Sequence, residues 1–93
     1  MTVLSEEEVR RALGELDGWE AAGEEITKQF EFADFRAAVS FVVRVAFEAE
    51  AANHHPDIDI RYNKVRVTVS THSEGGLTAK DIDLARAVDD LRR

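Results

Sequence analysis

The segment from Phe35 to about Ala52 constrains the fold more than any other part of the sequence, because it is the strongest helical pattern in the chain. Asp34, directly before it, can cap the helix. Apolar side chains recur at the i, i+3, i+4, i+7 spacing of one helix face, and we expect them to face the core: Phe35, Ala38, Val39, Val42, Ala46 and Ala49. Such a helix needs a surface to cover, which the rest of the chain has to supply.

The apolar surface of this helix extends beyond that one face. Only a narrow strip of Ser40, Arg44 and Glu48 is clearly polar, because four more residues widen the apolar part: Phe41, Val43, Val45 and Phe47. A helix that is apolar over most of its circumference is usually covered on more than one side. One side would meet this chain's own sheet. The other would meet either a second subunit or a neighbouring helix, and in the first case Phe41→Asp or Val45→Asp would lower the mass in solution.

Two pairs of short alternating segments predict the sheet. Trp19–Ala22 and Ile26–Phe32 are expected to form one hairpin, with a turn at residues 23–25. Residues 58–62 and 65–69 are expected to form a second hairpin. Asn63 lies at the bend of that second hairpin, where its tolerance of positive φ is useful.

Helices are predicted at both ends of the chain. Ser5 and Glu8 have the spacing of a capping box, and Thr78 can cap a last helix. The element order is therefore α-β-β-α-β-β-α. It predicts an α+β fold in which a four-stranded antiparallel sheet carries three helices on one face, and residues 1–93 form a single domain.

Composition excludes several classes of function. The 93 residues contain no cysteine, so disulfides and thiolate metal sites are not possible. The net charge of −7 is the wrong sign for a duplex-binding surface, so nucleic acid is not expected as a direct ligand. The N-terminal sequence lacks a signal-peptide pattern and no apolar stretch reaches membrane-spanning length, so we expect a cytoplasmic protein with no membrane partner.

The three histidines are the candidates for chemistry. His54 and His55 stand directly before Pro56, the only proline, at the end of the long helical pattern, and His72 follows the last predicted strand. Singly, each histidine is more often structural than functional. A metal site is disfavoured, because adjacent histidines rarely aim both rings at one ion and there is no H-E-x-x-H pattern. General acid–base catalysis without a cofactor fits better, because imidazole exchanges protons near neutral pH.

The positions of these histidines resemble the pattern of the pterin-4a-carbinolamine dehydratase family. That pattern is an acidic residue, His-His-Pro after three positions, an aromatic residue, a histidine after nine positions, and a spaced aspartate. The matching residues here are Glu50, His54, His55, Pro56, Tyr62, His72 and Asp81. The likeness covers nearly the whole chain and has the same element order. Ile58 departs from it, because an aromatic residue is common there.

The resemblance implies a reaction and a set of site residues. The family eliminates water from a 4a-hydroxytetrahydropterin to give the quinonoid dihydropterin, as in tetrahydrobiopterin recycling, and it uses no metal or redox cofactor. By this likeness the catalytic set is His54, His55 and His72, with His55 more concerned with orienting the pterin. The same three histidines would also bind the substrate, together with four polar residues: Asn53, Ser70, Thr71 and Ser73. Glu50, Pro56 and Asp81 would support the site.

Alternatives remain for the weaker positions and for the function. Asp81 has capping-box spacing after Thr78, Glu50 is either a partner of a histidine or a solvated carboxylate, and Tyr62 is better explained by packing. The rival function is a non-catalytic dimerisation or assembly partner, like a transcriptional coactivator, on the same fold. In either case we expect a homodimer or, as the resemblance suggests, a homotetramer. A further protein partner, such as a hydroxylase or a regulator, stays open.

Overall fold

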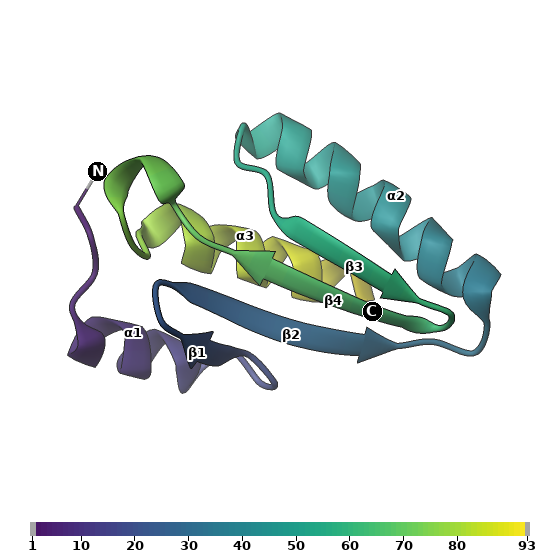
Figure 1. Ribbon diagram of the computed structural model, residues 1–93, viewed down its shortest axis with the longest axis horizontal. Coiled ribbons are helices and arrows are strands. Elements are labelled where there is room, and N and C mark those ends of the chain that lie inside the picture. The colour runs from purple at the N-terminus through teal and green to yellow at the C-terminus, as the bar shows by residue number, and fades with distance from the viewer. Residues whose placement is uncertain (1, 93) are drawn as a thin grey trace.

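The computed structural model describes residues 2–92 and contains three α-helices and four strands (Figure 1). The strands form one antiparallel sheet in the order β1-β2-β4-β3. This arrangement confirms the predicted α+β fold. The elements are α1 (Glu6–Leu13), β1 (Glu20–Ala22), β2 (Glu25–Glu31), α2 (Phe35–Ala52), β3 (Asp57–Arg61), β4 (Lys64–Val69), the 3₁₀-helix η1 (His72–Glu74) and α3 (Ala79–Arg92).

The register of the second hairpin positions the two loops that carry the histidines. Asp57 at the start of β3 pairs with Thr68 near the end of β4. The loop before β3, residues 53–56, therefore lies beside the loop after β4, residues 70–76. Figure 1 shows both loops at the same end of the sheet, with η1 and the C-terminal end of α2 close by.

One face of the sheet carries the helices and the other is polar. Ile26 and Phe30 of β2 are buried beneath the helices, as are Val65, Val67 and Val69 of β4. Alternate residues point to the opposite face because side chains alternate along a strand. On that face the Thr27 and Thr68 hydroxyls are 3.0 Å apart across the β2–β4 pair. The sheet thus has one buried face and one open face, as an antiparallel sheet permits.

The prediction of which side of α2 faces the core was partly wrong. Ala38, Phe41, Val45 and Ala49 are the buried residues of this helix, and the Phe41 ring lies 4.8 Å from the Phe30 ring. Phe41 and Val45 are thus core residues and cannot form an outer contact surface. The periodicity was correct, but a helix with apolar residues nearly all round does not by itself define its inner face.

Other apolar residues of α2 lie on the outside. Phe35, Val43 and Phe47 are exposed, Phe47 to 73%. The predicted core set therefore includes one exposed aromatic residue. No helix within residues 2–92 combines the length and the apolar character needed to cross a membrane.

The β3–β4 bend differs from its predicted form. Tyr62, and not Asn63, has the positive φ at the β3–β4 bend, with a value of 52°. Asn63 contributes in another way, because its side-chain amide donates to the Phe32 carbonyl at 2.8 Å. Tyr62 is 66% exposed, so the packing role expected for it is wrong.

Helix α1 spans only eight residues. Its capping box is confirmed, but the helix ends at Leu13 with Gly14 as its C-cap. Leu16 is nevertheless buried, because the following turns fold it into the same core.

Candidate active site

His54 is held by a buried carboxylate. Its Nε2 lies 2.6 Å from Oδ1 of Asp81, and only 11% of the His54 side chain is exposed. Asp81 is fully buried in the first turn of α3. A buried carboxylate is costly unless it is paired and hydrogen-bonded, so this contact fixes the His54 ring firmly.

Asp81 itself is held from the other side. Its Oδ2 accepts from the Thr71 hydroxyl at 2.8 Å and from the Thr78 backbone N–H at 2.9 Å. The second of these bonds is one half of a capping box, with Thr78 as the N-cap residue. The Asp81 side chain therefore both caps helix α3 and contacts His54.

His55 makes a weaker pair on the surface. Its Nε2 lies 2.6 Å from Oε1 of Glu50, one turn back in α2. The exposed fractions of these side chains are 57% and 78%, and exposed ion pairs contribute little to stability. Of the two alternatives for Glu50, the structure thus favours that of a histidine partner. It orients the ring of His55 more than it stabilises the fold.

His72 begins η1 and is exposed. Its ring makes no hydrogen bond to another residue among 2–92. The loop beneath it is well defined, because Thr71 and Gly76 form a bridge and Gly75 takes the left-handed conformation with φ of 73°. His72 thus has both ring nitrogens available on a rigid base.

The four polar residues predicted to line the site divide into two groups. Asn53 is the left-handed C-cap of α2 with φ of 50° and is exposed, as is Ser73. The side-chain hydroxyls of Ser70 and Thr71 are already engaged within the protein, that of Ser70 with the Glu24 carbonyl at 2.9 Å. Pro56 is half-buried between His55 and β3.

Sequence reasoning missed the contribution of Thr78 to the site. The sequence identifies Thr78 as a helix cap and as part of the family resemblance, but not as a contact of Thr71 and Asp81. The signal was present in part, because the spacing of Thr78 and Asp81 predicts that their backbone and side chain meet. Nothing in that local pattern indicates that the pair is buried against Thr71 and against His54, which lies 27 residues before Asp81.

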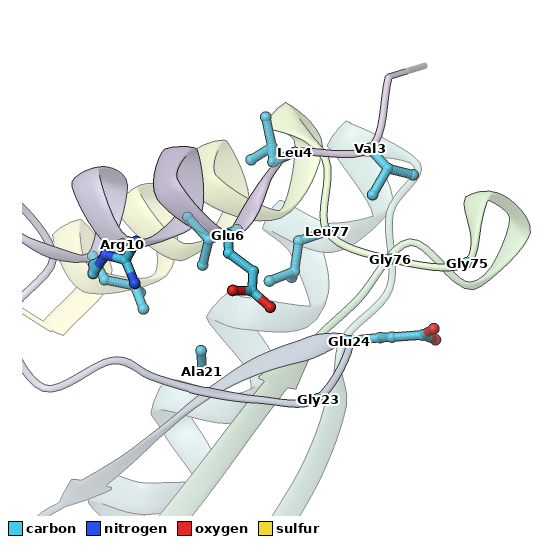
Figure 2. A pocket seen from close by; sticks show the side chains of 12 residues that line it. Val3, Leu4, Glu6, Arg10, Ala21, Gly23, Glu24, Gly75, Gly76 and Leu77 are labelled. Atoms are coloured by element: carbon cyan, nitrogen blue, oxygen red, sulfur yellow. The ribbon is translucent and has the colours of Figure 1, made fainter.

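Two cavities lie near this end of the molecule. His54 lines a groove of about 390 Å³ between the end of α2 and the start of α3, together with Ala51, Ala52 and Lys80. A larger cavity of about 460 Å³ lies between α1, the β1–β2 turn and residues 75–77 (Figure 2). The second cavity is mainly aliphatic and contains none of the histidines, so volume alone does not identify the site.

The spacing of the histidine and acidic side chains shows whether they could bind a metal ion together. Within the part of the chain that the structure describes, no three histidine or acidic side chains lie close enough together to hold a metal ion. His54 and His55 each use Nε2 for a carboxylate of the protein. The arrangement therefore offers proton donors and acceptors rather than a chelating cluster.

Comparisons with known proteins agree with one another. The family model described as "Pterin 4 alpha carbinolamine dehydratase" matches residues 2–91. A protein of Roseiflexus sp. (strain RS-1), named "Putative pterin-4-alpha-carbinolamine dehydratase", is 53% identical over 90 residues, which is 97% of each chain. A protein of the same name from Nocardia farcinica is 52% identical and covers 98% of this chain and 96% of its own.

Solved structures give the same result for the fold. A transcriptional coactivator/pterin dehydratase from Brucella melitensis is 42% identical and superimposes with a TM-score of 0.93, covering 97% of this chain and 98% of its own. A pterin dehydratase-like RuBisCO assembly factor of the α-carboxysome is 22% identical, with a TM-score of 0.66, over 78% of this chain and 84% of its own. The latter shows the fold alone.

Proposed function

The chain belongs to the pterin 4 alpha carbinolamine dehydratase family, and we propose that it eliminates water from a 4a-hydroxytetrahydropterin to give the quinonoid dihydropterin. The observation that carries this proposal is the buried His54–Asp81 pair at 2.6 Å, beside a loop that carries the exposed His72. Both histidines belong to the motif through which the chain resembles this family.

The reaction needs one proton donor and one proton acceptor. The bond between the bridgehead carbon C4a and its hydroxyl oxygen breaks, and the oxygen leaves as water after it receives a proton. The lone pair of the neighbouring N5 forms the new C=N double bond, and the proton on N5 is removed by a base. Electrons and atoms balance without an oxidant or a reductant, so histidine acid–base chemistry suffices for both transfers.

The geometry supports different roles for the three histidines. His54 and His72 are proposed as the acid–base pair, because one is fixed by a buried carboxylate and the other has free ring nitrogens on a rigid loop. His55 is exposed and its ring is only loosely oriented by Glu50, which suits contact with the pterin ring more than proton transfer. Asn53 and Ser73 are exposed on the same two loops and are proposed to line the pterin.

A dehydration assay tests the proposal. Freshly generated 4a-hydroxytetrahydropterin is mixed with the protein, and loss of its absorbance is compared with the spontaneous rate. His54→Ala and His72→Ala are each expected to lower the catalysed rate by about 10²–10⁴-fold, the usual contribution of one positioned proton transfer. His55→Ala should raise KM more than it lowers kcat. Near wild-type rates for both His54→Ala and His72→Ala, in variants with native circular dichroism, would remove the assignment.

Chelation provides a separate test of the same chemistry. Dialysis of the protein against a strong chelator should leave the dehydration rate unchanged, because every proposed step uses ring nitrogens of histidine. Loss of activity that added zinc restores would contradict this mechanism and would support Lewis-acid catalysis instead.

We also propose that the outer stripe of α2 is covered in a homo-oligomer. The stripe consists of Phe35, Val43 and Phe47, which are exposed at four- and eight-residue spacings along one side of the helix. Burying such a surface contributes roughly 25 cal/mol per Å² of apolar area. Phe47→Asp should therefore lower the mass measured by sedimentation. The dehydration rate of the same variant then shows separately whether catalysis needs the oligomer.

A non-catalytic assembly role is the second candidate. The same outer stripe of α2 favours it, because an exposed apolar helix face also suits a different protein partner. A wild-type monomer at high micromolar concentration, together with no dehydratase activity, would support this second function over the first.

A further inference from the structure

A chain of buried hydrogen bonds lies behind His54. The Thr71 and Thr78 hydroxyl oxygens are 2.9 Å apart, and the Thr71 hydroxyl donates to Oδ2 of Asp81 at 2.8 Å. All three side chains are buried, with Thr78 and Asp81 fully enclosed. Buried polar groups that are all satisfied in this way hold a single arrangement, because each broken bond would leave an uncompensated polar atom.

The direction of each bond in this chain follows from the number of hydrogens. The only hydroxyl hydrogen of Thr71 is used on Asp81, so Thr71 accepts from Thr78. The Thr78 oxygen in turn accepts from the backbone N–H of Lys80 at 3.3 Å. Oδ2 of Asp81 also receives the Thr78 N–H, so two donors occupy that oxygen and leave Oδ1 for His54.

This directionality determines which nitrogen of His54 carries its proton. The Asp81 carboxylate accepts both of these bonds on Oδ2 and has no hydrogen of its own to donate. The contact at 2.6 Å is therefore a bond from Nε2–H of His54 to Oδ1. In the neutral ring the other nitrogen, Nδ1, then has a free lone pair.

The described part of the protein leaves Nδ1 of His54 without a partner. It makes no hydrogen bond to another residue among 2–92. In that same part of the chain, no fully enclosed side-chain nitrogen or oxygen lacks a partner, so the unpartnered Nδ1 retains some exposure to solvent. This agrees with the exposed fraction of the His54 side chain and with its place in the wall of the groove between α2 and α3.

We propose that Thr71 and Thr78 are positioning residues that, through Asp81, keep the proton of His54 on Nε2 and assign Nδ1 as the atom that exchanges protons with the substrate. The inference rests on the proposed function in one respect, namely that His54 is an acid–base group. The tautomer itself is a property of the free protein and is independent of catalysis.

Nuclear magnetic resonance of the full chain with ¹⁵N-labelled histidine measures the tautomer without substrate. In the wild type we expect the neutral ring of His54 to show one tautomer, with a slowly exchanging downfield proton on Nε2 and an unprotonated Nδ1. A wild-type His54 with its proton on Nδ1, or with two tautomers in rapid exchange, would overturn the proposal without the need for any variant.

Variants of Thr71 connect the tautomer to the rate. Thr71→Val removes the hydroxyl at nearly constant volume, so the Nε2 proton should exchange faster and the Nε2–H fraction should fall. The dehydration kcat should fall roughly tenfold, as expected when one hydrogen bond to a charged group is lost, with little change in KM. Thr71→Ser keeps the hydroxyl and should restore both properties. Thr68→Val is the matched control, because Thr68 also bonds a threonine hydroxyl but on the open face of the sheet.

The two readouts separate failure of this inference from failure of the proposed function. A Thr71→Val protein with the wild-type tautomer overturns the positioning role, whatever its rate, because Thr71 would then act by another route. A changed tautomer with an unchanged rate supports the positioning role and counts against His54 as the acid–base group. A change in both, with rescue by Thr71→Ser and none in Thr68→Val, supports the whole proposal.

Discussion

Helices α1 and α3 both begin with a capping-box motif, but the acidic residue of the motif has different partners in the two helices. At α1 the Ser5 N–H donates to Glu8 at 2.9 Å and the Glu8 N–H donates back to the Ser5 hydroxyl at 3.1 Å, all on the surface. At α3 the Thr78 N–H donates to Asp81 at 2.9 Å, but this aspartate is fully buried. The α1 box involves only residues of its own helix end, whereas Asp81 of the α3 box also bonds to Thr71 and His54.

The two boxes are also neighbours in space. The N–H of Leu4, directly before Ser5, donates to the carbonyl of Leu77, directly before Thr78, at 2.7 Å. The two capping boxes therefore differ in the residues that surround them and not in where they lie in the fold. Asp81 is covered by Thr71 and His54, whereas Glu8 meets water. Identical cap chemistry becomes part of a site only where burial gives the second carboxylate oxygen a protein partner.

The largest expected effect is a difference in dehydration rate between variants of the two capping-box acids, Asp81 and Glu8. Asp81→Asn replaces a carboxylate oxygen with an amide, so the side chain would present N–H to His54 Nε2 and favour the wrong ring tautomer. We expect the dehydration rate to fall by about 10²–10⁴-fold, as when a histidine loses its orienting carboxylate elsewhere. Glu8→Gln is the matched change at the surface box, and the same assay should show the wild-type rate. Equal rates for the two variants would remove the distinction.

A smaller effect is expected in the free energy of unfolding, which should differ between variants of the N-cap residues Ser5 and Thr78. Ser5→Ala removes an exposed cap and should lower the free energy of unfolding by about 1 kcal/mol. Thr78→Ala should cost about 2–3 kcal/mol, because it also removes a buried methyl group and the donor to Thr71. Urea unfolding followed by circular dichroism measures both. A cost for Thr78→Ala no larger than that of Ser5→Ala would show that burial adds nothing to this cap.

The smallest expected effect is a dependence of stability on pH at the surface box. Hydrogen bonding from the Ser5 backbone and side chain holds the pKa of Glu8 below its ordinary value, with a smaller contribution from Arg11. A carboxyl whose pKa is lower in the folded state stabilises the fold fully above its unfolded pKa, about 4.3 for glutamate. That contribution is lost as the pH falls through the lowered value.

Glu8→Gln tests this dependence. The difference in unfolding free energy between wild type and variant should be constant near pH 7 and should shrink in the acid range below about pH 4. A difference that stays the same from neutral to acid pH would contradict the role of the Glu8 charge. Ser5→Ala should reduce the same dependence without abolishing it, because the Ser5 backbone N–H remains.

Much of the fold follows from patterns that span only a few residues. Capping at Ser5, Asp34 and Thr78 and the alternation along the later strands are set by local backbone hydrogen bonding and side-chain direction, so they predict the element order correctly. Turn details were less predictable. Tyr62 takes the positive φ at the bend, and Asn63 instead donates to the carbonyl of Phe32, which is distant in the sequence.

The sequence alone determined the helices, the strands, the family pattern and the identity of the three histidines, because each depends on residue type and spacing. Only the tertiary structure decided that Phe41 and Val45 face inward, since an almost wholly apolar helix packs by the shape of its neighbours. Only the tertiary structure joined His54 to Asp81, 27 residues later, with Thr71 and Thr78 behind them. Such a buried network depends on which surfaces meet and exclude water, and no local pattern encodes that meeting.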